Sequence, residues 1–204
     1  HRAASTFAPE NTVAALGYSI EAKADAAEID VQILKDETLI IMHDDNFKRT
    51  TGIDKNVWDA TYSEVKEYDA GSFFSTDYAG EPIPTLEEML QAAKNKIHLM
   101  IELKLTGHEQ RSVLVKQTLD LIRKNGMMKQ CSIASMNLEI LNEVKQLEPQ
   151  IETVYITPLL YSQDYGIDYV DGYSVETTSL TVDMVMAANF QGKKVYGWTA
   201  NSEN

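Results

Sequence analysis

Residues 27–43 read AEIDVQILKDETLIIMH, which is two strand patterns joined by a short Lys-Asp-Glu-Thr turn. In Ala27–Ile33, polar and apolar residues alternate with a period of two, as they do in a strand that has one face in the core. A crossover between parallel strands needs roughly a dozen residues or more, and only a turn is available before Leu39. The two strands are therefore expected to form an antiparallel hairpin, whose second strand ends at His43.

The open end of this hairpin carries three residues with functional side chains. Glu28 and Asp30 lie two apart on the first strand, so they project from the same face. If the turn tip lies at Asp36 and Glu37, Asp30 faces His43 across the hairpin. The usual glycine of such a tip is absent, which leaves a register shifted by one residue open. In either register the two carboxylates and His43 gather at the open end.

Strand and helix patterns alternate through the rest of the chain. We expect strands at 97–104, 130–135, 153–157, 171–176 and 194–199, and helices at 13–20, 85–94, 108–125, 138–146 and 182–189. Strands that alternate with helices at this spacing favour a parallel α/β fold, and a (β/α)₈ barrel fits best. Six such strands and the hairpin partner are present, so we expect the first and last barrel strands to be missing or truncated.

The segment of approximately residues 45–84 breaks this rhythm. It is rich in aromatic residues, and glycine and proline interrupt it at Gly52, Gly71, Gly80 and Pro82. Such breakers are typical of turns and irregular structure. We interpret the segment as a small insertion folded over one end of a single domain that covers residues 1–204.

The composition excludes several classes of partner. With 18 Lys and Arg against 31 Asp and Glu, the net charge is −13, and the chain lacks the basic face that nucleic acids and anionic lipids need. A phosphate-bearing substrate would therefore need a bound cation or a few placed basic residues. No apolar run approaches the roughly 20 residues that cross a bilayer. The single cysteine, Cys131, rules out an internal disulfide and a cysteine-based zinc site.

Acidic residues on strand positions point to a metal site. Glu102 and Lys104 share one face of their strand, as Glu28 and Asp30 do on theirs. Buried acids are costly unless they are paired or metal-bound, so a structural salt bridge between Glu102 and Lys104 is one alternative. Three carboxylates on two strands favour a hard cation such as Mg²⁺ or Ca²⁺ instead. His43 ends a strand beside them, and histidine is the natural acid or base near neutral pH.

A series of short motifs runs along the whole chain. They are His1-Arg-Ala, Ala8-Pro-Glu-Asn-Thr12, Glu28-Ile-Asp-Val-Gln32, Met42-His-Asp44, Arg49-Thr-Thr-Gly52, Ile83-Pro-Thr-Leu86, Ile101-Glu-Leu-Lys104 and Trp198-Thr-Ala-Asn201. In this order and spacing they resemble the signature of the glycerophosphodiester phosphodiesterases. The resemblance implies a distorted (β/α)₈ TIM barrel of the phospholipase C-like phosphodiesterase type, with a small insertion after the second histidine.

The resemblance also implies an activity, which is the metal-dependent hydrolysis of glycerophosphodiesters to glycerol 3-phosphate and an alcohol. It assigns Glu28, Asp30 and Glu102 as the ligands of one divalent cation, either Ca²⁺ or Mg²⁺. It assigns His1 and His43 as the general acid/base pair. The substrate is then a small-molecule phosphodiester, and no nucleic acid is expected as a partner.

Four further residues receive substrate-binding roles by the same resemblance. Arg2 and Lys104 are expected to bind the phosphate, and Glu10 and Trp198 are expected to line the site. The family has glycine where Ala3 stands, which reduces the backbone freedom beside His1. This departure removes neither a ligand nor a proton-transfer group.

Two other functions stay open at this stage. One is a lipid-directed phospholipase-type phosphodiesterase of the same superfamily, and the other is a catalytically idle barrel that serves as a binding module. The insertion and the Gly107-His-Glu109 stretch are most similar to the catalytic module of membrane-anchored bacterial members. A membrane tether outside this fragment is therefore one expected arrangement, with the catalytic domain outside the bilayer, and a cytoplasmic location is the other.

Overall fold

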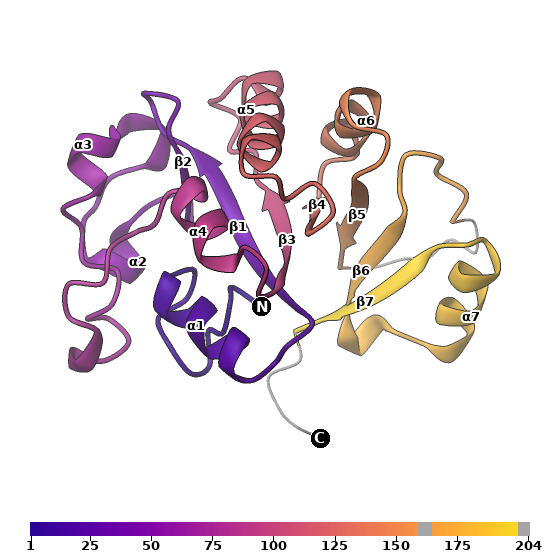
Figure 1. Cartoon of the computed structure of the whole chain (residues 1–204), viewed down its shortest axis with the longest axis horizontal. Coiled ribbons are helices and arrows are strands. Elements are labelled where there is room, and N and C mark those ends of the chain that lie inside the picture. Colours follow the sequence, from indigo (N-terminus) through magenta and orange to yellow (C-terminus); the bar gives the residue numbers. More distant parts are fainter. Residues whose placement is uncertain (159–164, 200–204) are drawn as a thin grey trace.

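The structure is a computed structural model that describes residues 1–158 and 165–199 (Figure 1). Its strands are β1 (Ala26–Ile33), β2 (Leu39–Ile41), β3 (His98–Leu103), β4 (Cys131–Ser135), β5 (Glu152–Thr157), β6 (Gly172–Glu176) and β7 (Lys194–Trp198). Its α-helices are α1 (Val13–Glu21), α2 (Lys48–Thr51), α3 (Tyr62–Val65), α4 (Leu86–Ala93), α5 (Arg111–Lys124), α6 (Leu138–Leu147) and α7 (Val182–Phe190). Three short 3₁₀ helices, η1 (Val57–Asp59), η2 (Thr76–Tyr78) and η3 (Thr177–Ser179), lie in the connections.

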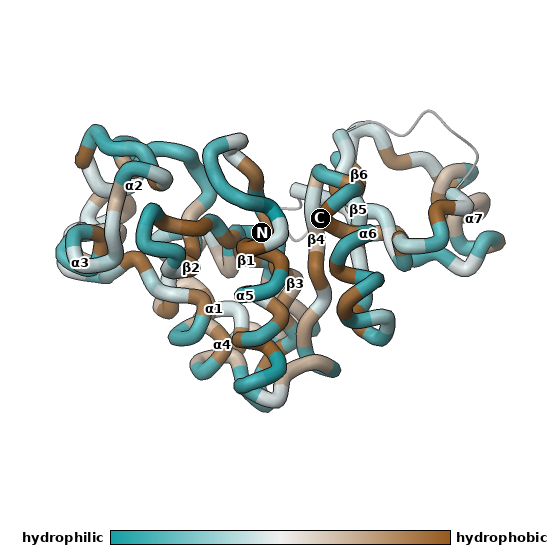
Figure 2. Tube along the Cα trace, turned by 90° about the horizontal axis from the view of Figure 1, so that it is seen from above, coloured by the Kyte–Doolittle hydropathy of each residue, from teal (hydrophilic) through white to brown (hydrophobic). Residues whose placement is uncertain are grey.

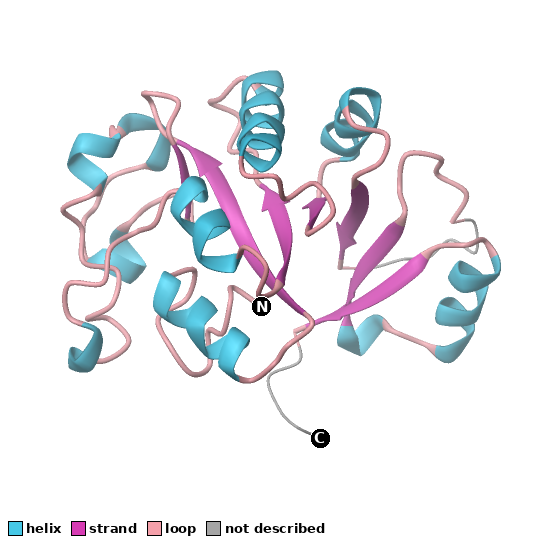
Figure 3. Ribbon diagram, in the orientation of Figure 1, coloured by secondary structure: helices cyan, strands magenta, loops and turns pink. Residues whose placement is uncertain are grey.

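All seven strands form one sheet, in the order β2-β1-β3-β4-β5-β6-β7. Only β1 and β2 are antiparallel, and every other neighbouring pair of strands is parallel. Among the described residues β2 and β7 are the two edges, so the sheet does not close on itself. Figure 3 shows the helices arranged around this fan of strands. An open, mostly parallel sheet wrapped by helices fits the predicted distorted barrel.

The helix starts follow from local capping chemistry. Thr12 is the N-cap of α1, because its side chain accepts a hydrogen bond from the amide of Ala15. The helix α4 begins with a capping box, in which Thr85 and Glu88 each accept from the other's backbone amide. Asn11, which precedes the N-cap of α1, has left-handed backbone with a φ of 59° and donates from its side chain to Asp30.

The hairpin is antiparallel as predicted, but the expected pairing of Asp30 with His43 is wrong. The observed register pairs Val31 with Ile41, and the amide of Met42 donates to the carbonyl of Asp30. The shift by one residue arises because the loop has three residues, closed by a hydrogen bond from the amide of Leu34 to the carbonyl of Thr38. Glu37 has a φ of 64° and supplies the left-handed turn residue of such a loop, where glycine is usual.

The helix α5 begins three residues later than the predicted start at His108. The carboxylate of Glu109 accepts hydrogen bonds from the amides of Thr106 and His108, which closes a turn ahead of the helix. Gly107 has a φ of 89° within this turn, a conformation that an α-helix cannot contain. The predicted strands and the other helices agree with the observed ones to within a few residues at their ends.

Among the described residues, two of the three apolar clusters contain most of the core, and the third lies on the inner face of the sheet. The larger one packs the outward face of the sheet, including Ile29 and Ile101, against α1, α4, α5 and α6. The smaller one lies under the segment after β2 and includes Ile40, Phe47 and Val65. Figure 2 shows hydrophobic residues concentrated along the strands, with hydrophilic residues frequent in the outer loops. Among the described helices, none combines the length and the apolar character that a membrane crossing requires.

Candidate active site

The two neighbouring strands β1 and β3 bring three carboxylates together. These strands are parallel, and their register places Asp30 directly beside Glu102 and Glu28 beside Met100. Because side chains alternate along a strand, Glu28, Asp30 and Glu102 share the inner face of the sheet. One oxygen from each carboxylate lies within 4.8 Å of the other two. We call these three residues the carboxylate cluster.

Neighbouring loops fix the orientation of the carboxylate cluster. The Asn11 side chain donates to Asp30 Oδ2 at 2.7 Å, and its own oxygen accepts from the Asp30 amide at 3.3 Å. The amide of Arg2 donates to Glu28 Oε2 at 2.7 Å. Asp30 is only 1% exposed, so these contacts replace the water that a carboxylate would otherwise bind.

Positive charge within the site does not balance the carboxylate cluster. Lys104 lies 3.4 Å from Asp30 and 3.6 Å from Glu102, which leaves one ammonium among three carboxylates. The Oε1 atom of Glu28 is buried and has no hydrogen-bond partner. A salt bridge between Glu102 and Lys104 is therefore present, but it does not account for the whole cluster.

The energetic cost of this arrangement is visible in the acidities of the carboxyl groups. Burial raises the pKa of Glu28 to about 8, and the nearby charge of Asp30 adds to this effect. Burial likewise raises the pKa of Glu102 to about 7, with the charge of Lys104 opposing the shift. A cluster of oxygen donors with a buried, unpartnered oxygen fits a hard divalent cation such as Mg²⁺ or Ca²⁺.

His43 follows the end of β2 and is held by the residue beside it. Its Nδ1 atom lies 2.8 Å from Asp44 Oδ1. Arg49 donates to both oxygens of Asp44, at 2.6 and 3.0 Å. The same guanidinium donates to both oxygens of Glu10, at 2.6 and 2.9 Å, and Glu10 in turn pairs with Arg2 at 3.0 Å. A continuous chain of charged contacts thus connects His43 to the loop before α1.

These ion pairs lower the pKa values of the two acids that take part. Burial works against the lowering at Asp44, but hydrogen bonds from Arg49 and His43 outweigh it and bring the pKa to about 2. Burial also opposes the change at Glu10, and Arg49 and Arg2 together leave its pKa below the usual value. Both carboxylates are therefore ionised at neutral pH and act only as hydrogen-bond acceptors.

Gln32 supports the backbone on which His43 sits. It is the next inward residue of β1 after Asp30 and is 1% exposed. Its side-chain amide nitrogen donates to the carbonyls of Met42, His43 and Asp44, at 2.9, 3.2 and 2.9 Å. One buried amide thereby binds three consecutive carbonyls and fixes the path of the chain through His43.

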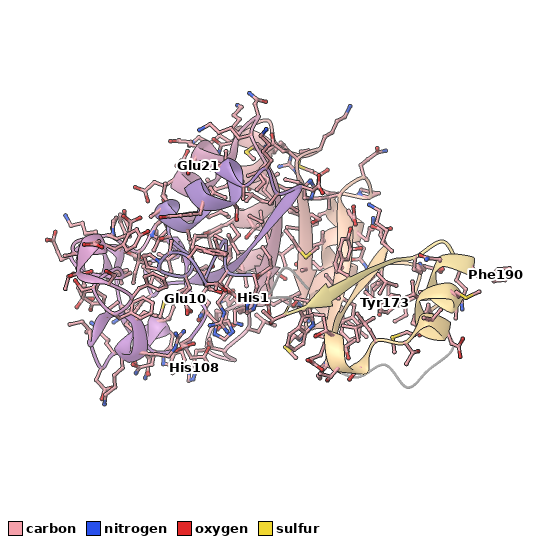
Figure 4. The ribbon with its side chains drawn as sticks, turned by 90° about the horizontal axis from the view of Figure 1, so that it is seen from below. His1, Glu10, Glu21, His108, Tyr173 and Phe190 are labelled. Atoms are coloured by element: carbon pink, nitrogen blue, oxygen red, sulfur yellow. The ribbon has the colours of Figure 1, made fainter. Side chains whose placement is uncertain are left out.

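The structure brings most of the predicted site residues to the carboxylate cluster or to the charged contacts beside it. Arg2, Glu10 and Lys104 all contact the carboxylate cluster or the chain of charges beside it. His1 is exposed and directly precedes Arg2, in the loop that also carries Glu10 (Figure 4). Trp198 lies on β7, packs against the inner apolar residues of the sheet and donates to the carbonyl of Ser174. The last residues of its motif, 200 and 201, lie outside the described part of the chain.

Four residues of this site received no role from sequence reasoning. They are Asn11, Gln32, Asp44 and Arg49. Each one lies inside a motif that the family resemblance marks, and that was the only available signal. Their partners are distant in sequence or belong to the backbone, which local patterns do not reveal.

A second polar group occupies the inner face at the amino ends of the strands. His98 Nε2 lies 3.1 Å from Ser132 Oγ, and Glu152 accepts from Lys194 and Tyr196, both at 2.7 Å. We call these five residues the amino-end cluster. Tyr196 reaches Glu152 across β6 at Gly172, where an added Cβ would lie 3.1 Å from the tyrosine ring.

A separate cavity of ≈ 270 Å³ lies between the hairpin and the beginning of α5. Trp58 and His108 line it, and their rings are stacked with centroids 3.9 Å apart. His108, the residue expected to start a helix, thus joins the segment after β2 to the loop after β3. The residues that line this cavity do not include those of the carboxylate cluster.

Comparison with known proteins agrees with this geometry. Residues 1–204 match the model of the glycerophosphoryl diester phosphodiesterase family. A glycerophosphodiester phosphodiesterase of Bacillus subtilis is 31% identical over 222 residues, which cover 100% of this chain and 76% of that protein. One from Caldanaerobacter subterraneus subsp. tengcongensis is 31% identical over 206 residues, which cover 98% and 84%.

The fold has a close counterpart among solved structures. A phosphodiesterase from Oleispira antarctica, solved with the product sn-glycerol-3-phosphate, superimposes with a TM-score of 0.90. It is 28% identical to this chain, and the match covers 100% of this chain and 84% of that one. The similarity in fold therefore extends over the whole sheet and the hairpin.

Proposed function

Because the chain belongs to the glycerophosphoryl diester phosphodiesterase family, we propose that it hydrolyses glycerophosphodiesters to glycerol 3-phosphate and an alcohol. The product bound to the Oleispira antarctica phosphodiesterase, sn-glycerol-3-phosphate, supports this choice of reaction. The observation that carries the proposal is the carboxylate cluster, in which three buried or partly buried acids converge with one lysine between two of them.

The carboxylate cluster is proposed to hold one divalent cation, either Ca²⁺ or Mg²⁺. Its donors are all oxygens, which hard cations prefer over the nitrogen and sulfur donors of zinc sites. The unpartnered Oε1 of Glu28 is available as a ligand. When bound, such a cation would polarise a phosphoryl oxygen and reduce the repulsion between an anionic substrate and the acidic site.

The phosphate is proposed to lie between Arg2 and Lys104. The Nε atom of Arg2 is buried and lacks a hydrogen-bond partner, so it has a donor free for a phosphate oxygen. Lys104 is 18% exposed at its side chain and reaches the edge of the carboxylate cluster. Arginine and lysine in these positions would neutralise substrate charge that the net charge of −13 otherwise repels. Glu10 and Trp198 are proposed to complete the lining of the site.

His43 and His1 are proposed as the general acid/base pair. One histidine would remove the proton from the attacking hydroxyl, and the other would protonate the departing alcohol oxygen. The ionised Asp44 can only accept a hydrogen bond, so neutral His43 carries its proton on Nδ1 and presents Nε2 for proton transfer. His1 is proposed from the family resemblance and from its place beside Arg2.

The direct test is the release of glycerol 3-phosphate from purified protein. Glycerophosphocholine and glycerophosphoethanolamine would be assayed with Ca²⁺, with Mg²⁺ and with EDTA. We expect release with at least one cation and none with EDTA, followed by recovery when the cation is added back. Absence of release under every condition would overturn the enzymatic proposal.

Two additions to the same assay determine the class of substrate and the identity of the nucleophile. A lysophospholipid as substrate separates a lipid-directed enzyme from one that acts on water-soluble diesters. Accumulation of a cyclic glycerol phosphate in a stopped reaction would identify the glycerol 2-hydroxyl as the nucleophile. Appearance of glycerol 3-phosphate without any cyclic intermediate would identify water instead, since both routes leave one solvent oxygen in the phosphate.

A further inference from the structure

We propose that Arg49 is a positioning residue for this reaction, whose guanidinium joins the loop of His43 to the loop that begins with His1. The inference rests on the proposed role of His43 and adds a residue that acts through it. Arg49 lies in the four-residue helix α2, outside the sheet, and its side chain is 44% exposed. It therefore contacts the site from the segment after β2.

The geometry of Arg49 matches two carboxylates at once. Its Nε and Nη2 atoms contact the two oxygens of Asp44, and Nη1 and Nη2 contact those of Glu10, all between 2.6 and 3.0 Å. A guanidinium is planar and carries five donors in a fixed fork, so two bidentate contacts fix it in both direction and rotation. The ammonium of lysine is a point charge and cannot reproduce this pattern.

One end of this bridge continues to His43, and the other continues to the loop that carries Arg2. Asp44 accepts from Nδ1 of His43, which fixes both the ring orientation and the nitrogen that carries the proton. Glu10 accepts from Arg2, whose backbone amide also donates to the Oε2 of Glu28. Arg49 thus sets the spacing between the ring of His43 and the loop that presents Arg2 to the carboxylate cluster.

The exposure of Arg49 argues against a role that is mainly structural. Ion pairs of an exposed guanidinium contribute little to folding stability, and the Arg49 side chain is 44% exposed, while its partners Asp44 and Glu10 are 29% and 11% exposed. The chain contains a matched case at Arg123, which bridges Asp120 and Glu148 far from the site and is 53% exposed. Both arginines are exposed and each bridges two carboxylates, but only Arg49 contacts a carboxylate that is hydrogen-bonded to a histidine.

The test compares Arg49→Lys, Arg49→Ala and Arg123→Lys in the cation-supplemented assay. We expect kcat to fall about tenfold in Arg49→Lys and by up to about 100-fold in Arg49→Ala, since misplacing a reacting group by about 1 Å can cost about 100-fold. KM should change less than kcat, and added guanidinium ion should restore part of the activity of Arg49→Ala. Arg123→Lys should retain wild-type kcat, and thermal unfolding should show that all three variants fold.

A spectroscopic signature tests positioning directly. In wild-type protein, ¹⁵N NMR of the His43 ring should report the tautomer protonated on Nδ1, and Arg49→Ala should show a mixture of tautomers. Wild-type kcat and an unchanged ring tautomer in both Arg49 variants would overturn the inference. An equal loss of kcat in Arg123→Lys would also overturn it, because the effect would then not depend on His43.

A different result would contradict the proposed acid/base role of His43. His43→Ala with wild-type turnover would end the acid/base assignment, whatever the Arg49 variants show. If His43→Ala is inactive while both Arg49 variants are fully active, only the inference about Arg49 is wrong. The two claims are therefore separated by one set of variants and one assay.

Discussion

The carboxylate cluster and the amino-end cluster occupy the same inner face of the sheet and use similar residue types, but only the second is balanced. In the amino-end cluster, Glu152 accepts from Lys194 and Tyr196, and His98 pairs with Ser132. In the carboxylate cluster, Lys104 contacts only Asp30 and Glu102, and one buried oxygen of Glu28 has no partner.

The difference identifies which cluster is built for a ligand. Buried polar groups in folded proteins are nearly always hydrogen-bonded, so an exception indicates a missing partner or a functional role. Like charges brought together at a cost to stability are typical of catalytic sites. The polar groups of the amino-end cluster form hydrogen bonds with one another and therefore stabilise the fold. The contrast can be tested by changing matched residues in the two clusters.

The largest expected effect is at the two histidines. His43→Ala should lower kcat by about 10²–10⁴-fold, the usual contribution of acid/base catalysis, with little change in cation affinity. His98→Ala should leave kcat close to wild type and lower the free energy of unfolding by about 1–2 kcal/mol, because Ser132 loses its partner. Steady-state kinetics, calcium titration and urea unfolding measure these three quantities. A similar loss of kcat in both variants would remove the distinction between the clusters.

The second prediction concerns the free energy of unfolding, which should rise for a variant of the carboxylate cluster and fall for a variant of the amino-end cluster. Glu28→Gln removes one of three repelling carboxylates, so in EDTA the free energy of unfolding should rise by about 1–2 kcal/mol while activity is lost. Glu152→Gln removes a charge that is paired with Lys194 and should lower the free energy of unfolding by about 0.5–1 kcal/mol without loss of activity. Urea unfolding in EDTA provides the comparison. Changes of the same sign in both variants would contradict the proposed imbalance.

The smallest effect follows from the acidity of Asp44. Its pKa is lowered from 3.8 to about 2 by Arg49 and His43 against the effect of burial, so its charge stabilises the fold above pH 4. That contribution is lost as the pH falls through about 2. Asp44→Asn should therefore cost about 1 kcal/mol at pH 6, a value reduced for solvent screening, and progressively less towards pH 3.

The measurement for Asp44 is the urea midpoint of wild type and variant from pH 3 to pH 7. Glu152→Gln serves as the matched variant from the amino-end cluster. The gap between wild type and Asp44→Asn should narrow on acidification. A gap that stays constant or widens towards pH 3 would show that the ion pair with Arg49 does not lower the pKa of Asp44.

The parts of the structure that depend on local pattern could be predicted from the sequence. The period of two in β1 places Glu28 and Asp30 on one face, and the short turn requires the hairpin. Glu102 joins them because β1 and β3 are neighbouring parallel strands. The capping box at Thr85 is a four-residue pattern with its own chemistry. The hairpin and the capping box are decided within a few residues along the chain, and the neighbouring placement of β1 and β3 follows from the regular alternation of strands and helices.

The remaining features depend on conformations or contacts that no local pattern encodes. The hairpin register required Glu37 in a left-handed conformation, which is uncommon for a residue with a side chain. Asn11 reaches Asp30 only because its own backbone is left-handed. The contact of Arg49 with Glu10 joins positions 39 apart and needs the folded loops to exist first. The contact of the Trp198 indole with the carbonyl of Ser174 likewise joins positions 24 apart.

The alternation of β1 has a consequence for how the protein acquires its activity. The inward residues Glu28, Asp30 and Gln32 carry the proposed chemistry, and the intervening Ile29 and Val31 lie in the main apolar cluster at 0% exposure. A shift of one residue in the pairing of β1 would place the carboxylates in the main apolar cluster and Ile29 on the inner face of the sheet. A chain with this shifted register is therefore disfavoured by the cost of burying charged groups, whether or not it is active. When Ile29 and Val31 are buried in the apolar cluster, Glu28, Asp30 and Gln32 necessarily lie on the inner face, where the proposed site is.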